Sequence, residues 1–146
     1  MIKIEYPVKK PSIKSENNKE TVFCVIRKRW MLLTPEEWVR QNFLLYLIEI
    51  LKYPVSLIGV EKQLLLGEMK KRFDIIVYKN DIPFMIVECK EMNVSLSENT
   101  LRQVLNYNTN IQASYMVITN GSYCMAYKKE DNRFLEVNEL PNTKIL

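Results

Sequence analysis

Histidine is absent from this sequence of 146 residues, and glycine occurs only three times. Without an imidazole, the chain cannot form a serine triad, most catalytic zinc sites or the site of a histidine-dependent nuclease. The glycines, Gly59, Gly67 and Gly121, are too far apart to form a Walker A loop or a GxGxxG turn. These absences exclude a nucleotide-driven motor and a dinucleotide enzyme.

Cysteine pairing and long apolar runs are missing as well. Cys24, Cys89 and Cys124 are odd in number and include no CxxC pair, so neither a disulfide framework nor a zinc knuckle is indicated. No apolar run approaches the roughly 18 residues needed to span a bilayer, and the N-terminus lacks the apolar centre of a signal peptide. We therefore expect a cytoplasmic protein in a reducing compartment, with no membrane partner.

The composition that remains is that of one compact domain, with 47% hydrophobic and 26% charged residues. Residues 1–20 are polar and read as an extended N-terminal arm with weak order, which leaves 21–146 as a single domain. The net charge is +4, and Lys and Arg gather at 27–29, 70–72 and 128–129. Such clusters are either solvated surface or contacts for a phosphate backbone.

The pattern of apolar residues predicts strands alternating with two helices. The first helix has strong boundary signals, with Thr34 as N-cap, Pro35 in the first turn and Glu37 completing a capping box. Asn80 and Asp81 supply turn residues between two near-continuous apolar strands, which would pair in antiparallel fashion. The expected elements are strands at 21–31, 57–66, 72–80, 82–90 and 115–119, two further strands in the tail, and helices at 35–52 and 97–112.

Residues 84–92, "FMIVECKEM", begin as an apolar run and then carry an acid and a base two positions apart. Side chains alternate along a strand, so Glu88 and Lys90 share one face, and leaving water together is costly unless they pair well or hold an ion. Asp74 begins the neighbouring strand. The alternative is that Asp74 is an ordinary strand-end residue and that Glu88 and Lys90 form a weak surface pair.

The order of these elements, with the segments "TPEEWVRQ", "KRFDIIVY", "IVECKE" and "LRQVLNYN", resembles the PD-(D/E)XK nuclease superfamily. More narrowly, residues 34–121 are similar to the N-terminal nuclease domain of type I restriction enzyme R subunits. The resemblance implies an α/β, restriction-endonuclease-like fold, in which a mixed central β-sheet is flanked by helices in the core order α-β-β-β-α-β. It also implies a catalytic core of Asp74, Glu88 and Lys90.

The chemistry of phosphodiester hydrolysis agrees with that core. The carboxylates of Asp74 and Glu88 are hard oxygen ligands suited to Mg²⁺, for which Mn²⁺ would substitute, and the backbone carbonyl of Cys89 could be a third. Lys90 would orient or deprotonate water, or offset developing charge. The two carboxylates converge only if residues 74 and 88 lie opposite each other. A two-residue turn at 80–81 alone would place Asp74 opposite Val87, so we expect a three-residue loop or a bulge that restores the pairing.

The first helix offers one more acid, either Glu36 or Glu37. Glu36 lies on the helical stripe that continues through Arg40 toward the sheet, whereas Glu37 already has a capping role, so Glu36 is the preferred metal ligand and Glu37 the alternative. Arg40 would either pair with Glu36 or contact phosphate. Arg72 would contact DNA or neutralise the carboxylates.

Four further polar residues are candidates of lower specificity. Gln103 and Tyr107 reproduce the QxxxY pattern that several families of this superfamily carry after the catalytic lysine, and they would bind phosphate or orient the lysine. The alternative is that Tyr107 is a core residue and Gln103 a solvated one. Glu61 and Gln63 would face the same cleft from the neighbouring strand.

The expected function is a Mg²⁺-dependent endonuclease acting on DNA in restriction or repair. The alternatives are a nuclease-like fold retained for DNA binding or partner docking, with weak or absent cutting, and a structural core with an accidental motif. Type I R subunits carry a motor after this domain, so motor or specificity functions would come from separate subunits. Because many relatives work as dimers, a homodimer is also among the partners to test.

Overall fold

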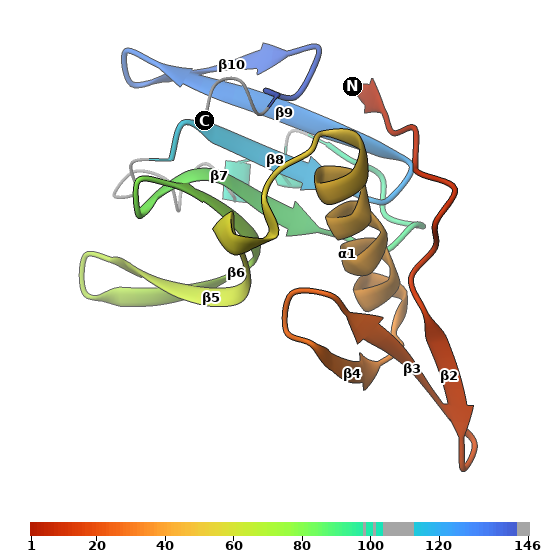
Figure 1. The fold of residues 1–146 in the computed structure, drawn as a ribbon. Helices are drawn as coiled ribbons and strands as arrows, with labels where there is room; N and C mark the ends of the chain where they lie inside the picture. The colour runs from red at the N-terminus through yellow and green to blue at the C-terminus, as the bar shows by residue number, and fades with distance from the viewer. Residues whose placement is uncertain (98, 101, 104–112, 143–146) are drawn as a thin grey trace.

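The computed structural model describes residues 1–97, 99–100, 102–103 and 113–142, and shows a large mixed sheet, a small antiparallel sheet and one long helix (Figure 1). The large sheet has seven strands, β1 (Ile2–Lys3), β5 (Ile58–Leu66), β6 (Met69–Lys79), β7 (Ile82–Cys89), β8 (Tyr115–Thr119), β9 (Tyr123–Glu130) and β10 (Arg133–Val137). The small sheet has three, β2 (Ile13–Glu16), β3 (Lys19–Cys24) and β4 (Arg29–Leu32).

The strand order of the large sheet is β1-β9-β8-β7-β6-β5, with β10 also paired to β9. Strands β7 and β8 are parallel, and the other pairs are antiparallel. A parallel pair requires a crossover connection, which here runs through residues 90–114. Most of the helix predicted at 97–112 lies outside the described residues, but residues 99, 100, 102 and 103 are helical. The expected mixed α/β sheet is confirmed, and the full core order stays a prediction.

Helix α1 (Pro35–Leu45) begins as its sequence predicts. Thr34 has an extended backbone, and its hydroxyl accepts a hydrogen bond from the amide of Glu37 at 3.0 Å. The helix continues as a π-helical turn, η1 (Tyr46–Ile50), and a 3-10 turn, η2 (Val55–Leu57), precedes β5. The first helix, with its π-helical turn, therefore ends at Ile50, two residues earlier than expected. Pro54 lies shortly after this end, and a proline disfavours helix in the residue before it.

The apolar runs of β6 and β7 are buried on both faces of the sheet. One core includes Val39, Phe43 and Leu47 of α1 together with Ile75 and Val87 of the sheet. A second core lies on the other face, with members that include Phe73, Ile76, Ile86, Met116 and Ile118. Burial on both sides explains why these strands read as continuous apolar sequence and not as an alternating pattern.

Two expectations for the N-terminal third are wrong. Residues 21–31 do not form one strand, because a turn with a positive φ at Lys28 (56°) divides them between β3 and β4. Residues 1–20 are extended but not weakly ordered. Strand β1 pairs with β9, the side chain of Ile4 is buried, and β2 pairs with β3. Their polar composition hid the few residues that pair with the sheet.

No helix of the described residues is both long and apolar enough to cross a bilayer.

Candidate active site

The register of β6 and β7 brings Asp74 and Glu88 together. Asn80 and Asp81 both have positive φ angles, 53° and 63°, as a two-residue type I′ turn requires. That turn alone would misplace Asp74, but the register shifts between Val77 and Tyr78, so that Ile75 pairs with Val87. Because the strands are antiparallel, the neighbouring residues Asp74 and Glu88 then lie opposite each other. The bulge that we expected as the alternative to a longer loop is therefore present.

Asp74 is held in place through both of its carboxylate oxygens. Oδ1 accepts a hydrogen bond from Nη2 of Arg40 at 2.8 Å, and Oδ2 accepts one from the backbone amide of Cys89 at 2.8 Å. The second contact joins β6 directly to the end of β7. Each oxygen retains a further lone pair, so these bonds orient the carboxylate without exhausting it.

Two side-chain atoms of the site are buried without a hydrogen-bond partner among the described residues, Nε of Arg40 and one carboxylate oxygen of Glu88, Oε1. Burial, the charge of Asp74 and a hydrogen bond with Asp74 together raise the pKa of Glu88 from 4.5 to about 7, although Lys71 and Lys90 act in the opposite direction. A carboxylate with this pKa gains and loses its proton near neutral pH. Such a perturbed pKa is typical of residues in functional sites.

Lys90 lies just past the end of β7 and is half-buried. Its backbone amide donates to the carbonyl of Thr119 on β8 at 2.8 Å, which anchors the segment. Its ammonium is close enough to lower the pKa of both Glu88 and Glu36. The predicted acid, acid and lysine therefore share one electrostatic environment, to which the structure adds Lys71, a residue that our sequence analysis had placed only in a basic cluster.

The two glutamates at the start of α1 differ in burial and in contacts. Glu37 is buried, and its carboxylate accepts hydrogen bonds from Arg27, Arg40 and Gln41 instead of completing the capping box. The side chain of Glu36 is 51% exposed and lies 3.8 Å from Arg40. Burial and the charge of Asp74 raise the pKa of Glu36. The preference for Glu36 as the metal ligand stays a prediction, whereas the carboxylate of Glu37 is held by an arginine outside the helix, Arg27.

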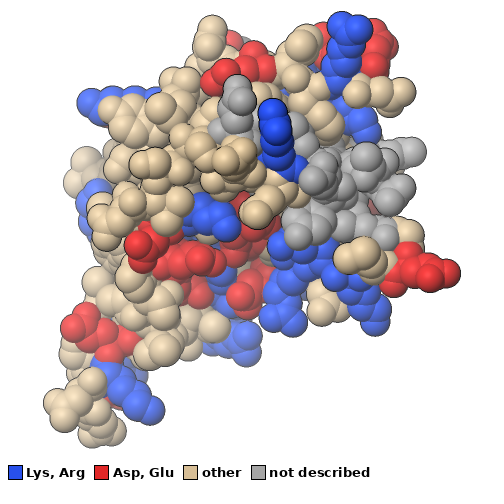
Figure 2. Space-filling model, turned by 180° about the vertical axis from the view of Figure 1, so that it is seen from behind, with Lys and Arg blue, Asp and Glu red and all other residues tan. Residues whose placement is uncertain are grey.

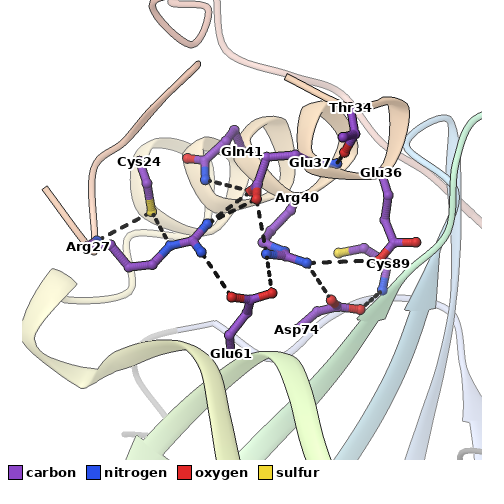
Figure 3. Close-up of polar contacts among 10 residues, drawn as sticks. All are labelled: Cys24, Arg27, Thr34, Glu36, Glu37, Arg40, Gln41, Glu61, Asp74 and Cys89. Carbon is purple, nitrogen blue, oxygen red and sulfur yellow. Dashed lines mark hydrogen bonds and ion pairs between the residues drawn. The ribbon is translucent and has the colours of Figure 1, made fainter. Parts of the chain in front are cut away.

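That arginine belongs to an ionic network of Arg27, Glu37, Arg40 and Glu61 that lies between α1 and β5 (Figure 3). Arg27, in the turn between β3 and β4, binds Glu37 and Glu61 at 3.1 Å each. Arg40 binds the same two acids at 3.2 Å each and links them to Asp74. The four residues come from three separate segments, so only the fold brings them together.

Arg40 pairs with Glu36, one of the two roles expected of it, and Glu61 joins the network through an unusual backbone conformation. Arg40 is only 5% exposed, which favours a role in positioning Asp74 over a contact with phosphate. Glu61 reaches the network from β5 through a positive φ of 53°, a conformation that is strained for a glutamate. Our sequence analysis did not identify Arg27. The basic cluster at 27–29 was its only signal, and nothing in that cluster singles out one of its three residues.

The remaining candidates lie nearer the surface. Arg72 and Gln63 are exposed and lie opposite each other on β6 and β5. Gln103 is exposed, and Tyr107 lies outside the described residues. Figure 2 shows Asp and Glu side chains gathered near the middle of one face of the molecule, with Lys and Arg side chains around them. On this face, negative charge is thus bordered by positive charge.

Comparison with protein families gives one result that covers most of the chain. Residues 35–141 match the model of the family described as "Type I restriction enzyme R protein N terminus". The matched stretch begins with α1 and includes Asp74, Glu88 and Lys90. No curated protein matched the chain significantly. The chain belongs to the family of type I restriction enzyme R protein N-termini.

Proposed function

We propose that the protein is a metal-dependent endonuclease that hydrolyses phosphodiester bonds of DNA. One observation carries the proposal, the buried and unpartnered Oε1 of Glu88 beside Asp74. An unsatisfied buried carboxylate oxygen is costly to the fold, and such atoms persist where a ligand completes them. Family membership supports the nuclease-like activity, and the DNA substrate is inferred from the restriction enzymes to which the family belongs.

The residues of the site fit a magnesium ion. Mg²⁺ is held in proteins by one or two carboxylates together with waters and substrate phosphate, and dedicated all-protein cages are unusual. Asp74 and Glu88 supply two carboxylates, and the carbonyl of Cys89 lies between Glu88 and Lys90 in the chain. No group of three or more acid, cysteine or histidine ligands forms among the described residues, so waters and substrate phosphate would have to complete the coordination. Glu36, whose pKa responds to Asp74 and Lys90, is the acid of α1 that would approach the ion most readily, ahead of Glu37, which the ionic network holds.

In the proposed mechanism the ion, when bound, polarises the phosphoryl oxygen and activates water. Asp74, oriented by Arg40 and the amide of Cys89, holds its carboxylate toward Glu88. Glu88 loses its proton as the site is loaded, since a ligating carboxylate must be ionised. Lys90 places a positive charge at the end of β7, where it orients water or offsets the charge that develops on the phosphate.

Cleavage of supercoiled plasmid by the purified full chain tests the proposal. We expect nicking in Mg²⁺ or Mn²⁺, none in a chelator, and at least about a 100-fold loss in Lys90→Ala, as found when one charge-stabilising group is removed. Lys19→Ala is the matched control, because Lys19 is an exposed lysine of β3 in the small sheet. Cutting at the wild-type rate by Lys90→Ala would refute the assignment.

A second function is favoured by the contact between Arg40 and Asp74. A guanidinium 2.8 Å from Oδ1 competes with a metal for that oxygen, as it would in a nuclease-like fold kept for DNA binding or partner docking. This alternative predicts DNA binding that falls with salt, needs no metal and is not followed by cleavage. The plasmid experiment, combined with binding in chelator, separates the two functions.

A further inference from the structure

A cavity of about 530 Å³ lies on another side of α1 from the ionic network. Its walls come from the N-terminal segment, from α1 and from the turn between β8 and β9. Figure 1 shows the N-terminal segment passing beside α1 on its way from β1 to β2. Residues 1–34 precede the stretch that matches the family model, so this wall lies outside the matched residues.

Three aromatic side chains line the cavity, Tyr6, Trp38 and Tyr123. The hydroxyl of Tyr6 donates to the carbonyl of Gly121, and its ring meets that of Tyr46 edge to face at 6.1 Å, so Tyr6 is fixed. Tyr123 is 42% exposed, and Trp38 is half-buried. Partly exposed aromatic rings beside a cavity provide faces on which a planar ring can stack.

The charge around the cavity has one sign. Lys3 and Lys10 are exposed and line it, and the Nζ atom of Lys10 lies 5.8 Å from the centre of the Tyr6 ring. No acid is among the described residues that line the cavity. The ionic network contrasts with it, because there acids surround each arginine. Aromatic faces combined with lysines suit a ligand that has both a planar base and a phosphate.

The proposed catalytic residues do not line the cavity, but two of its walls are connected to Lys90. Met92, which lines it, follows Lys90 by two residues, and the amide of Lys90 is bonded to Thr119, two residues before Gly121. The turn is closely packed there, since a Cβ on Gly121 would lie 3.2 Å from Val39 and 3.6 Å from Met92. A DNA strand with one phosphate at Lys90 would therefore bring a neighbouring nucleotide to the cavity.

We propose that this cavity binds one unpaired nucleobase of the DNA strand, adjacent to the phosphate that is cut. The inference rests on the proposed nuclease function and extends it to a substrate class, DNA with an unpaired nucleotide beside the cleavage site. A base inside a duplex is stacked and cannot enter, so paired DNA must first lose a base from its stack. Stacking is tolerant of base identity, and the cavity therefore selects structure and not sequence.

Binding without cutting provides the direct test. The probe is a fluorescein-labelled 12-mer of thymidine, compared by anisotropy in EDTA with a duplex of equal length. Tyr123→Ala and Trp38→Ala should weaken binding of the single strand roughly 5- to 150-fold, and the duplex much less. Tyr123→Phe and Trp38→Phe should retain binding, because they keep an aromatic face, and they also control for folding.

Trp30→Ala is the matched control, because Trp30 is the chain's other tryptophan, lies on β4 and does not line this cavity. It should change the affinity less than twofold. Wild-type affinity in both Tyr123→Ala and Trp38→Ala would overturn the proposal. So would an equal loss of affinity for single-stranded and duplex DNA.

The nuclease proposal and the cavity proposal can be refuted independently of each other. Base-dependent binding that is lost in Tyr123→Ala, with no cutting of any DNA in Mg²⁺, would support the cavity and refute the nuclease. Cutting of an oligonucleotide that Tyr123→Ala leaves unchanged, and that an abasic position next to the cut does not slow, would support the nuclease and overturn the cavity.

Discussion

The ionic network and the carboxylate pair lie next to each other at α1, yet they differ in how well their charges are matched. In the network, Arg27 and Arg40 alternate with Glu37 and Glu61, and each acid contacts both arginines. Nε of Arg40 is buried there without a hydrogen-bond partner in the described part of the chain, but every charge of the network faces an opposite charge. In the carboxylate pair, defined as Asp74 and Glu88, two acids face each other and one buried oxygen has no partner. A matched cluster holds segments together, and an unmatched one has free energy to gain from a ligand.

Removing the arginine that joins the two regions should have the largest effect on folding. Arg40→Met leaves Asp74 without its arginine and leaves Glu37 and Glu61 with Arg27 alone, which costs about 3–5 kcal/mol of unfolding free energy. Urea denaturation in EDTA measures the loss. Arg72→Met is the control, because Arg72 is exposed, and it should change stability by less than about 0.5 kcal/mol.

The same variant sharpens the comparison when Mn²⁺ is added. A divalent ion should restore part of the stability of Arg40→Met and have a smaller effect on the wild type, because the ion replaces the missing positive charge. A variant that is as stable as the wild type in EDTA would show that the network is not structural.

Loss of a charge should stabilise the protein at the carboxylate pair, whereas it should destabilise the protein in the ionic network. The pKa of Glu88 is raised from 4.5 to about 7, so the folded protein binds a proton more tightly than the unfolded chain. Wild-type stability therefore falls as the pH rises from about 4.5 to about 7 and is level above that. Glu88→Gln cannot ionise and should be more stable than the wild type by roughly 1–3 kcal/mol at pH 8.

Urea denaturation in EDTA at pH 4 and pH 8 measures this difference, which should vanish at the lower pH. A difference that is the same at both values would mean that ionisation of Glu88 is not the cause. A destabilised Glu88→Gln would place this residue with the matched charges of the ionic network.

The pH dependence of metal affinity should show the same ionisation of Glu88. A ligating carboxylate must be ionised. The Mn²⁺ affinity should therefore increase about tenfold for each unit by which the pH rises toward about 7, and it should be constant at higher pH. Titration calorimetry between pH 5.5 and pH 8 measures the slope. Glu88→Gln should bind weakly with little pH dependence, and an equally steep slope in this variant would assign the proton to another group.

The smallest expected effect is at the cap of α1, where a substitution should lower stability without changing metal affinity. Thr34→Ala removes the hydroxyl that accepts from the amide of Glu37, at a cost of about 1 kcal/mol. The Mn²⁺ affinity should not change, because Thr34 does not contact the carboxylate pair. Thermal unfolding and calorimetry check both statements, with Ser95→Ala, an exposed serine, as the control.

Much of the fold was predictable because local signals agreed with the tertiary structure. The cap at Thr34, the turn at Asn80 and Asp81 and the buried strand at 115–119 all appear as expected. Local signals were misleading where a distant residue decides the outcome. Glu37 has the sequence of a capping-box partner, yet Arg27 holds its carboxylate.

The sequence by itself determined which groups could do chemistry, because residue type, strand alternation and family resemblance are local or linear properties. It singled out Asp74, Glu88 and Lys90 and excluded every mechanism that needs histidine. Only the tertiary structure decided which charges are matched. The pairing of Arg27 and Arg40 with distant acids, the bulge that aligns the two carboxylates and the cavity closed by the N-terminal segment all depend on contacts between segments far apart in the chain.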